Sequence, residues 1–131
     1  MVLIAAGGVV CLDGKVCLLR RSKSDFDEMW TNPGGKPKGK ETLEETAIRE
    51  VREELDVEVR ILRKLAEYED IRDGQLFGKY TGYLVGIVSG KPVLKEPDHF
   101  SEIGFFSLNE LPECITPYTR RYIEKMKQLG L

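Results

Sequence analysis

The sequence predicts an α/β (α+β) fold, in which a mixed β-sheet is sandwiched between helices. Two observations lead to this prediction. Runs that favour strands alternate along the chain with runs that favour helices, and the first two strand-like runs are joined by a tight turn. With 131 residues, 41% hydrophobic and 32% charged, the chain has the length and composition of one soluble globular domain. We therefore expect a single domain over residues 1–131.

The chain is predicted to open with a β-hairpin. Residues Leu3 to Leu12 and Lys15 to Arg20 are rich in strand-forming residues. Asp13-Gly14 between them is a strong hairpin signal, because both positions tolerate a positive φ. Residues 21–40 are polar and contain two prolines and three glycines, so we expect a long loop without regular structure.

A helix is predicted from Thr42 to about Leu55. Thr42-x-x-Glu45 forms a capping box, in which the threonine hydroxyl accepts the Glu45 N–H and the Glu45 carboxylate accepts the Thr42 N–H. At 100° per residue, one face of this helix is aliphatic and is expected to be buried. That face consists of Leu43, Ala47, Ile48, Val51 and Leu55.

The second half of the chain is predicted to contain three more strands and a last helix. Residues Val57 to Leu65 and Gln75 to Ser89 have the composition of strands, and Phe105 to Leu108 indicates a short buried one. Thr116-Pro117 supplies an N-cap and a first-turn proline for a helix that ends at Gly130.

Charge and cysteine content limit the expected partners and location. The chain has 20 Lys and Arg against 22 Asp and Glu, so no overall positive field attracts a nucleic-acid polymer. No segment approaches the roughly 20 apolar residues of a membrane-spanning helix, so we expect no membrane partner. Cys11, Cys17 and Cys114 are odd in number and form no CxxC pair, which predicts reduced thiols in a cytoplasmic protein.

Three carboxylates share one side of the predicted helix. Glu50, Glu53 and Glu54 are separated by three and four residues, so they lie together at the margin of the buried face. Like charges this close repel each other, and the cluster therefore predicts a compensating cation; oxygen ligands favour Mg²⁺ or Mn²⁺. The helix alone also allows a solvated face, on which Arg49 pairs with Glu45 and Glu53.

The spacing upstream of these carboxylates favours the metal interpretation. The chain runs Gly35-x5-Glu41-x7-Arg49-Glu50-Val51-x-Glu53-Glu54-x-Asp56-Val57, which resembles the Nudix box G-x5-E-x7-R-E-U-x-E-E-x-G-U, where U is aliphatic. Asp56 is the one departure, because the family has glycine there. This position follows the helix, where a left-handed conformation is favoured, and aspartate adopts that conformation at modest cost. We therefore expect the chemistry to be retained.

A rival pattern occupies the same loop. Gly34-x4-Gly39-Lys40 has the spacing of a phosphate-binding P-loop. Glu41, however, stands where that motif needs a serine or threonine hydroxyl for Mg²⁺, and no apolar strand comes directly before the glycines. The P-loop interpretation is disfavoured.

The resemblance implies that the chain hydrolyses a nucleoside diphosphate linked to a group X, with a divalent metal and an attacking water. On this basis Glu50 and Glu54 are expected metal ligands. Glu53 is expected to be a ligand and a candidate catalytic base, and the Gly34 carbonyl is expected to be a further ligand. The family often forms dimers, so a homodimer is compatible with the resemblance.

The other positions of the box have supporting roles in the family. Arg49 is expected to orient the catalytic carboxylates, Glu41 to brace the loop, and Gly35 to mark the start of the motif. Outside the box, Trp30, Arg20 and Glu102 are candidates for substrate contact. Weaker candidates are Arg21 and Lys23 for phosphates, Phe26, Tyr68, Phe77 and Tyr80 for base stacking, and Glu96, Asp98 and His99 for an extra ligand or base.

The box does not specify the group X. Family markers of other substrates do not match here: the first proline after Val57 is Pro92, too far downstream for the ADP-ribose marker. The predicted activity is therefore a nucleoside triphosphate pyrophosphohydrolase that releases a nucleoside monophosphate and pyrophosphate. A nucleotide-sugar or other nucleoside-diphosphate hydrolase is the first alternative. A module that binds nucleotides without cleaving them is the second, although the intact carboxylates disfavour it.

Overall fold

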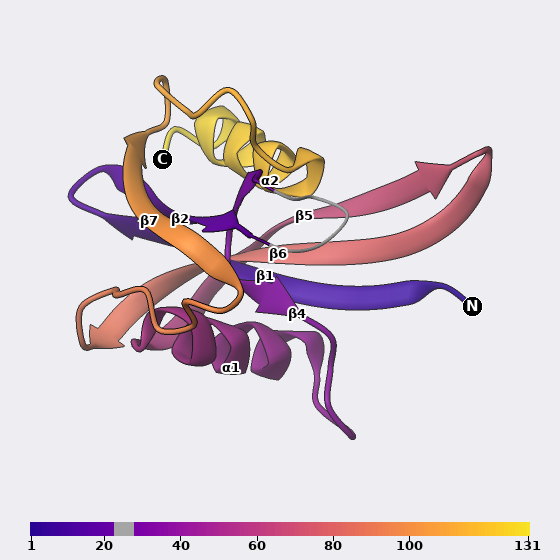
Figure 1. Cartoon of the computed structure of the whole chain (residues 1–131), viewed down its shortest axis with the longest axis horizontal. Helices are drawn as coiled ribbons and strands as arrows, with labels where there is room; N and C mark the ends of the chain where they lie inside the picture. Colours follow the sequence, from indigo (N-terminus) through magenta and orange to yellow (C-terminus); the bar gives the residue numbers. More distant parts are fainter. Residues whose placement is uncertain (23–27) are drawn as a thin grey trace.

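Figure 1 presents a computed structural model of the chain, which describes residues 1–22 and 28–131. Lys23 and Phe26, named above as substrate candidates, lie outside the described residues. The elements are β1 (Leu3–Leu12), β2 (Lys15–Arg21), β3 (Trp30–Thr31), β4 (Gly34–Gly35), α1 (Leu43–Leu55), β5 (Glu58–Arg72), β6 (Gln75–Ser89), β7 (Phe100–Ser107) and α2 (Pro117–Gln128).

The strands form one mixed sheet, as the sequence predicts. The central order is β3-β2-β1-β6-β5, with β4 paired to β1 and β7 paired to β2. Strands β1 and β6 run parallel from Leu3 opposite Gly78 to Val10 opposite Val85. The neighbouring pairs β1–β2, β2–β7 and β5–β6 are antiparallel.

The two helices cover opposite faces of this sheet (Figure 1). Because side chains alternate between the faces of a strand, neighbouring residues of β1 belong to different cores. Val10 packs in the cluster that contains Val51 of α1, whereas Val9 packs in the cluster that contains Met126 of α2. The predicted sandwich of a sheet between helices is thereby confirmed, with a separate apolar core under each helix.

Several local predictions are confirmed. Asp13 and Gly14 join β1 to β2 with φ of 53° and 76°. Thr42 caps α1 through both bonds of the capping box: the Glu45 N–H donates to the Thr42 hydroxyl at 3.1 Å, and the Thr42 N–H donates to the Glu45 carboxylate at 2.9 Å. The aliphatic stripe of α1 is buried or half-buried against the sheet.

Asp56 takes the conformation that the family glycine would take. Its φ of 60° and ψ of 38° lie in the left-handed region, and its N–H donates to the Arg52 carbonyl oxygen at 3.0 Å to close the helix. Its carboxylate also receives the Lys95 ammonium at 3.2 Å. The departure from the motif is therefore accommodated at the helix end.

Replacing Asp56 with glycine is expected to raise the free energy of unfolding by up to about 1 kcal/mol, because glycine adopts the left-handed conformation without steric cost. Activity should not change. Denaturant unfolding measures the effect, with Asp56→Ala as the control that keeps a Cβ and loses stability. If the glycine variant were less stable than the native chain, the contact between Asp56 and Lys95 would contribute more than the steric relief at the backbone.

Residues 30–35 of the loop predicted over 21–40 contain two short strands, so the prediction of a segment without regular structure was partly wrong. Trp30 and Thr31 pair with β2, and Gly34 and Gly35 pair with β1 opposite Gly7 and Ala6. Both strands are two residues long and are held by partners distant in sequence. A local pattern of prolines and glycines does not reveal such pairing.

Three element boundaries also differ. Strand β5 continues beyond Leu65 to Arg72 and forms a long hairpin with β6. Strand β7 begins at Phe100, and it is mostly half-exposed rather than buried because it lies at the edge beside β2. The last helix ends at Gln128, and Thr116 caps it without a side-chain bond. The Thr116 hydroxyl instead donates to the Thr119 hydroxyl at 2.7 Å.

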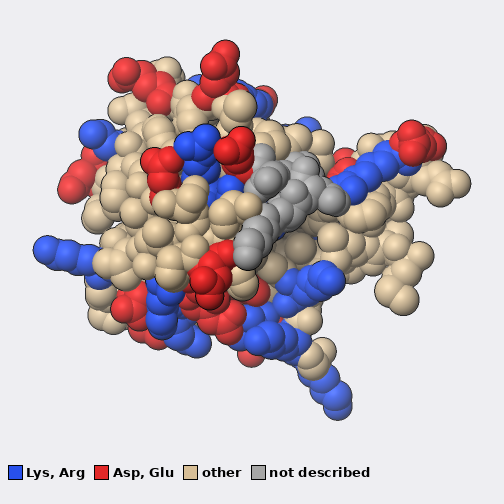
Figure 2. Space-filling model, in the orientation of Figure 1, with Lys and Arg blue, Asp and Glu red and all other residues tan. Residues whose placement is uncertain are grey.

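The surface agrees with the charge balance of the sequence. Figure 2 shows basic and acidic side chains interspersed on the face in view. Within residues 1–22 and 28–131, no helix is long and apolar enough to cross a membrane.

Candidate active site

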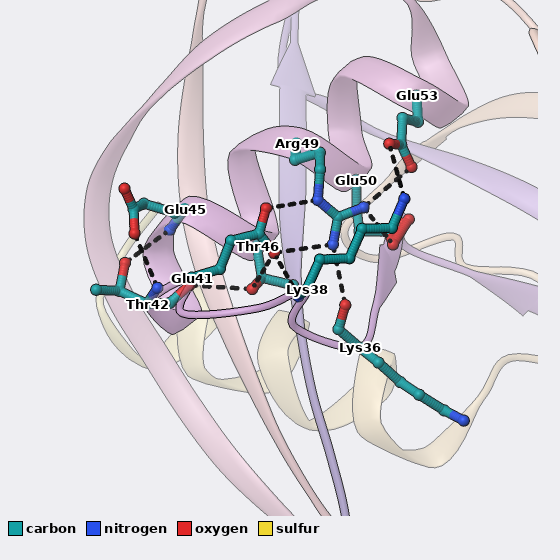
Figure 3. Close-up of polar contacts among 9 residues, drawn as sticks. All are labelled: Lys36, Lys38, Glu41, Thr42, Glu45, Thr46, Arg49, Glu50 and Glu53. Atoms are coloured by element: carbon teal, nitrogen blue, oxygen red, sulfur yellow. Dashed lines mark hydrogen bonds and ion pairs between the residues drawn. The ribbon is translucent and has the colours of Figure 1, made fainter.

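Arg49 connects the loop before α1 to the carboxylates of the helix (Figure 3). Its guanidinium binds Glu41 through two hydrogen bonds, at 2.6 and 3.0 Å, and donates to the Lys36 carbonyl oxygen at 2.9 Å. Its Nη1 donates to Glu50 at 3.2 Å and to Glu53 at 3.1 Å. One planar cation thus fixes the loop and two carboxylates relative to one another.

Glu41 is the brace of this loop. Besides the Arg49 bonds, its carboxylate accepts the Lys38 N–H at 2.9 Å and the Thr46 hydroxyl at 3.0 Å. These donors, chiefly the Arg49 guanidinium, lower the pKa of Glu41 to about 2. The side chain therefore stays ionised through the ordinary pH range.

The Glu41 contacts are expected to stabilise the protein in a pH-dependent manner. Because the folded-state pKa is about 2 and the ordinary value is 4.5, the contribution is complete above pH 4.5 and is lost as the pH falls toward 2. The difference in free energy of unfolding between the native chain and Glu41→Gln should shrink over that window. Denaturant titrations across this range test it, with the exposed Glu124→Gln of α2 as a control without such a trend.

Glu50 and Glu54 form a buried carboxylate pair beside the first glycines of the motif. Glu54 is only 3% exposed, and its carboxylate accepts the Gly34 N–H at 3.2 Å. The Glu50 side chain is 15% exposed and lies so close to Gly35 that a Cβ there would overlap its carboxylate. Burial raises the pKa of Glu50, and burial together with the neighbouring Glu50 raises the pKa of Glu54 well above its ordinary value.

This pair fits a divalent cation. Two desolvated carboxylates side by side need a proton or a metal ion to offset their repulsion, and carboxylate oxygens are ligands that Mg²⁺ and Mn²⁺ accept. Glu53 is less buried, at 37% exposure, and its carboxylate lies 3.1 Å from Arg49 and 3.8 Å from Lys38. Among the described residues no three acidic, histidine or cysteine side chains converge as a complete metal site. Further ligands would be backbone, water or substrate oxygens.

A cavity of about 430 Å³ opens beside this pair and extends along β1. At one end its lining includes Gly34, Gly35 and Glu54, and at the other it includes Phe77, Tyr80 and Tyr118. Gly34 is paired with Gly7 of β1, and Gly78 is paired with Leu3. Four residues of strand separate these two levels, a span of about 13 Å at roughly 3.3 Å per residue.

Tyr118 and Tyr122 of α2 also line the cavity, and sequence analysis missed both. Their spacing of four residues on a helix is the same as that of an ordinary buried stripe, so the pattern alone indicates only a core face. The one available signal was the pair of hydroxyl groups on that face. Asn32 was missed for a different reason, because the loop that carries it was predicted to be irregular.

Asn32 is held in the cavity wall by a buried hydroxyl network. Its N–H donates to the Thr119 hydroxyl oxygen at 3.1 Å, and that hydroxyl donates in turn to the Asn32 side-chain oxygen at 2.5 Å. The Asn32 amide nitrogen donates to the Pro33 carbonyl oxygen at 2.8 Å. The network joins α2 to the glycines of the motif.

The three main candidates outside the box do not line the cavity. Arg20 and Glu102 pair with each other at 2.8 Å across β2 and β7, and Trp30 packs edge to face on Phe106 at 4.9 Å. Among the described residues that line the cavity, none of these three is present, whereas Arg21 is.

The weaker candidates that the structure describes fall into two groups, one at the cavity and one beyond β6. Phe77 and Tyr80 line the cavity, and Tyr68 stacks on Tyr80 with ring centres 6.3 Å apart. Beyond β6, His99 lies 3.6 Å from Glu96. The Ser22 hydroxyl donates to the Asp98 carbonyl oxygen at 3.4 Å.

Comparison with known proteins agrees with the fold and the box. The model of the NUDIX domain matches residues 1–126, and the chain belongs to this family. It superimposes on a MutT NUDIX hydrolase from Burkholderia pseudomallei with a TM-score of 0.87 and 29% identity, covering 95% of this chain and 98% of that one.

Two curated relatives match by sequence. One is an ADP-ribose pyrophosphatase from Methanocaldococcus jannaschii, 30% identical over 84% of this chain. The other, from Bacillus subtilis, is named "Putative 8-oxo-dGTP diphosphatase YtkD" and is 32% identical over 82% of this chain. The chain spans 64% of the length of each of these relatives.

Proposed function

We propose that the chain is a divalent-metal-dependent hydrolase that converts a nucleoside triphosphate into a nucleoside monophosphate and pyrophosphate. One observation carries this proposal: the same cavity has the buried Glu54 carboxylate at one end and aromatic rings at the other. Its volume lies in the usual range for small-molecule sites. The separation of the two ends suits a ligand with phosphates at one end and a flat base at the other.

The proposed metal is Mg²⁺ or Mn²⁺. Glu50 and Glu54, with the Gly34 carbonyl, would hold it, and Glu53 would be a further ligand or the base that takes a proton from the attacking water. When bound, the ion neutralises phosphate charge and lowers the pKa of bound water. The buried, like-charged pair supports this assignment, because it needs such a cation to remain ionised.

The chain's own side chains supply orientation. Arg49 holds Glu50 and Glu53 through one nitrogen, so the two carboxylates are fixed before substrate arrives. Glu41 in turn fixes Arg49. Glu54 itself is shielded from bulk water, which strengthens the charge interactions of its carboxylate.

Hydrolysis of ADP-ribose or a related nucleoside diphosphate sugar is the second candidate. It is favoured by the similarity to the ADP-ribose pyrophosphatase named above. Both candidates use the same carboxylates and break the same kind of phosphoanhydride bond. They differ in what occupies the cavity beyond the second phosphate.

Product analysis by mass spectrometry distinguishes them. The protein is incubated with Mg²⁺ and separately with canonical and oxidised nucleoside triphosphates, nucleotide sugars, ADP-ribose and dinucleotides. Monophosphate plus pyrophosphate from a triphosphate is the expected result, and chelation of the metal should abolish it. Monophosphate plus a sugar phosphate would support the second candidate. Binding without turnover, detected as a higher melting temperature, would instead support a non-catalytic module.

A further inference from the structure

The outer end of the β5–β6 hairpin carries a cluster that the proposed chemistry at Glu54 does not use. Asp70 is only 8% exposed, and its carboxylate accepts the Tyr80 hydroxyl at 2.8 Å. It also accepts two hydrogen bonds from the Arg72 guanidinium, at 3.1 and 3.3 Å. The guanidinium carbon lies 3.6 Å from the centre of the Phe77 ring. Tyr80, Arg72 and Phe77 all line the cavity.

Two local features of the hairpin build this cluster. Gly78 lies opposite Asp70, and a Cβ at Gly78 would come within 2.6 Å of the Tyr80 hydroxyl. The missing side chain therefore lets the Tyr80 phenol reach Asp70. The register shifts between Asp70 and Ile71, so Phe77 is the extra residue of a β-bulge, a feature that redirects a side chain.

Stability alone does not account for a buried charge at this place. An apolar pair of similar volume often stabilises a protein as well as a buried ion pair does, so Asp70 and Arg72 are not needed to hold a hairpin together. Their effect is geometric. The Tyr80 hydroxyl donates its proton to Asp70, and the same carboxylate binds the Arg72 guanidinium that lies over Phe77. The rings of Tyr80 and Tyr118 meet edge to face at 5.3 Å.

We propose that Asp70 is a positioning residue for nucleobase recognition, and that by holding Tyr80 and Arg72 in the cavity wall it makes the site prefer guanine to adenine. This inference rests on the proposed function, because it takes the aromatic end of the cavity as the end that receives the base. A guanidinium has N–H donors and no acceptor. The guanine edge offers two acceptors, O6 and N7, whereas adenine presents its amino group as a donor at the equivalent position.

The location of Arg72 agrees with a base rather than a phosphate. Arg72 lies beyond the level of Leu3 and Gly78, which is about 13 Å along the strand from the glycines that contact the carboxylate pair. A second cation, Arg21, also lines the cavity. If Arg72 contacted a phosphate instead, its variants would lose affinity for GMP and AMP equally. The test below separates the two cases.

The test measures binding of GMP and AMP by calorimetry, so that it needs no turnover. The native chain is expected to bind GMP about tenfold more tightly than AMP, and Asp70→Asn should weaken GMP binding about tenfold while AMP binding changes less than about twofold. In parallel, KM for the guanine triphosphate should rise in Asp70→Asn while kcat stays within about twofold. The matched control is Glu58→Gln, a surface carboxylate paired with Arg52.

A second variant guards against a folding failure. Arg72 has a side chain that is 35% exposed, so Arg72→Lys is expected to fold, to keep the charge and to lose the planar fork. It should show the same selective loss of GMP binding. Equal affinity of the native chain for the two nucleotides, or equal losses for GMP, AMP and inorganic phosphate, would overturn the inference. A guanine preference without any triphosphate cleavage would overturn the proposed function alone.

Discussion

Glu54→Gln is expected to lower kcat by about 10²-fold or more while the metal-free protein unfolds at the same or a higher temperature. The two effects have one cause. Glu54 is 3% exposed and adjoins the Glu50 carboxylate, so its charge is costly to bury unless a cation offsets it. Glutamine keeps the shape and can still accept the Gly34 N–H, but it removes the charge that a metal ion would bind.

Opposite changes in activity and stability are what identify a functional carboxylate here. Kinetics with saturating Mg²⁺ and thermal unfolding in chelator measure the two quantities. Glu44→Gln, on the exposed side of the same helix, is the matched control and should change neither kcat nor the unfolding temperature.

Glu53→Gln should also lower kcat by about 10²-fold or more, with little effect on metal-free unfolding because this side chain is more exposed. Unchanged turnover in both Glu53 and Glu54 variants would refute the assignment of the box as the catalytic site.

Sequence reasoning was most successful where a residue's role depends on near neighbours in the chain. The capping box of Thr42 and Glu45, the apolar stripe of α1 and the left-handed Asp56 all follow from spacings of a few residues. The chemical grouping of Glu50, Glu53 and Glu54 follows from the same helical period. The sequence did not indicate that Glu50 and Glu54 are more deeply buried than Glu53. That difference depends on Gly34 and Gly35, which fold back against the helix.

Features that depend on distant pairing could not be predicted in this way. Arg20 and Glu102 both looked available for substrate, but β2 and β7 place them opposite each other, and they form an ion pair. Tyr118 was not singled out from the sequence, because only the position of α2 over the sheet brings it to the cavity. The aromatic end of the cavity is therefore a property of tertiary structure, whereas the carboxylate end is visible in the motif.

Gly82→Ala is expected to lower the free energy of unfolding by about 1–3 kcal/mol, the usual cost of overpacking a core. A Cβ at Gly82 would lie 2.5 Å from the ring of Tyr122, which is fully buried between β6 and α2. The ring can relieve the overlap only if α2 moves away from the sheet, which would also displace Tyr118 from the cavity. We therefore expect KM to rise as well.

Gly86→Ala on the same strand is the matched control, because its Cβ would meet the half-exposed Leu62 at 3.3 Å and should cost little stability. Denaturant unfolding of both variants tests the contact, and the smaller Tyr122→Leu in the Gly82→Ala background should recover part of the loss. Equal stability of the two alanine variants would show that the helix adjusts without cost.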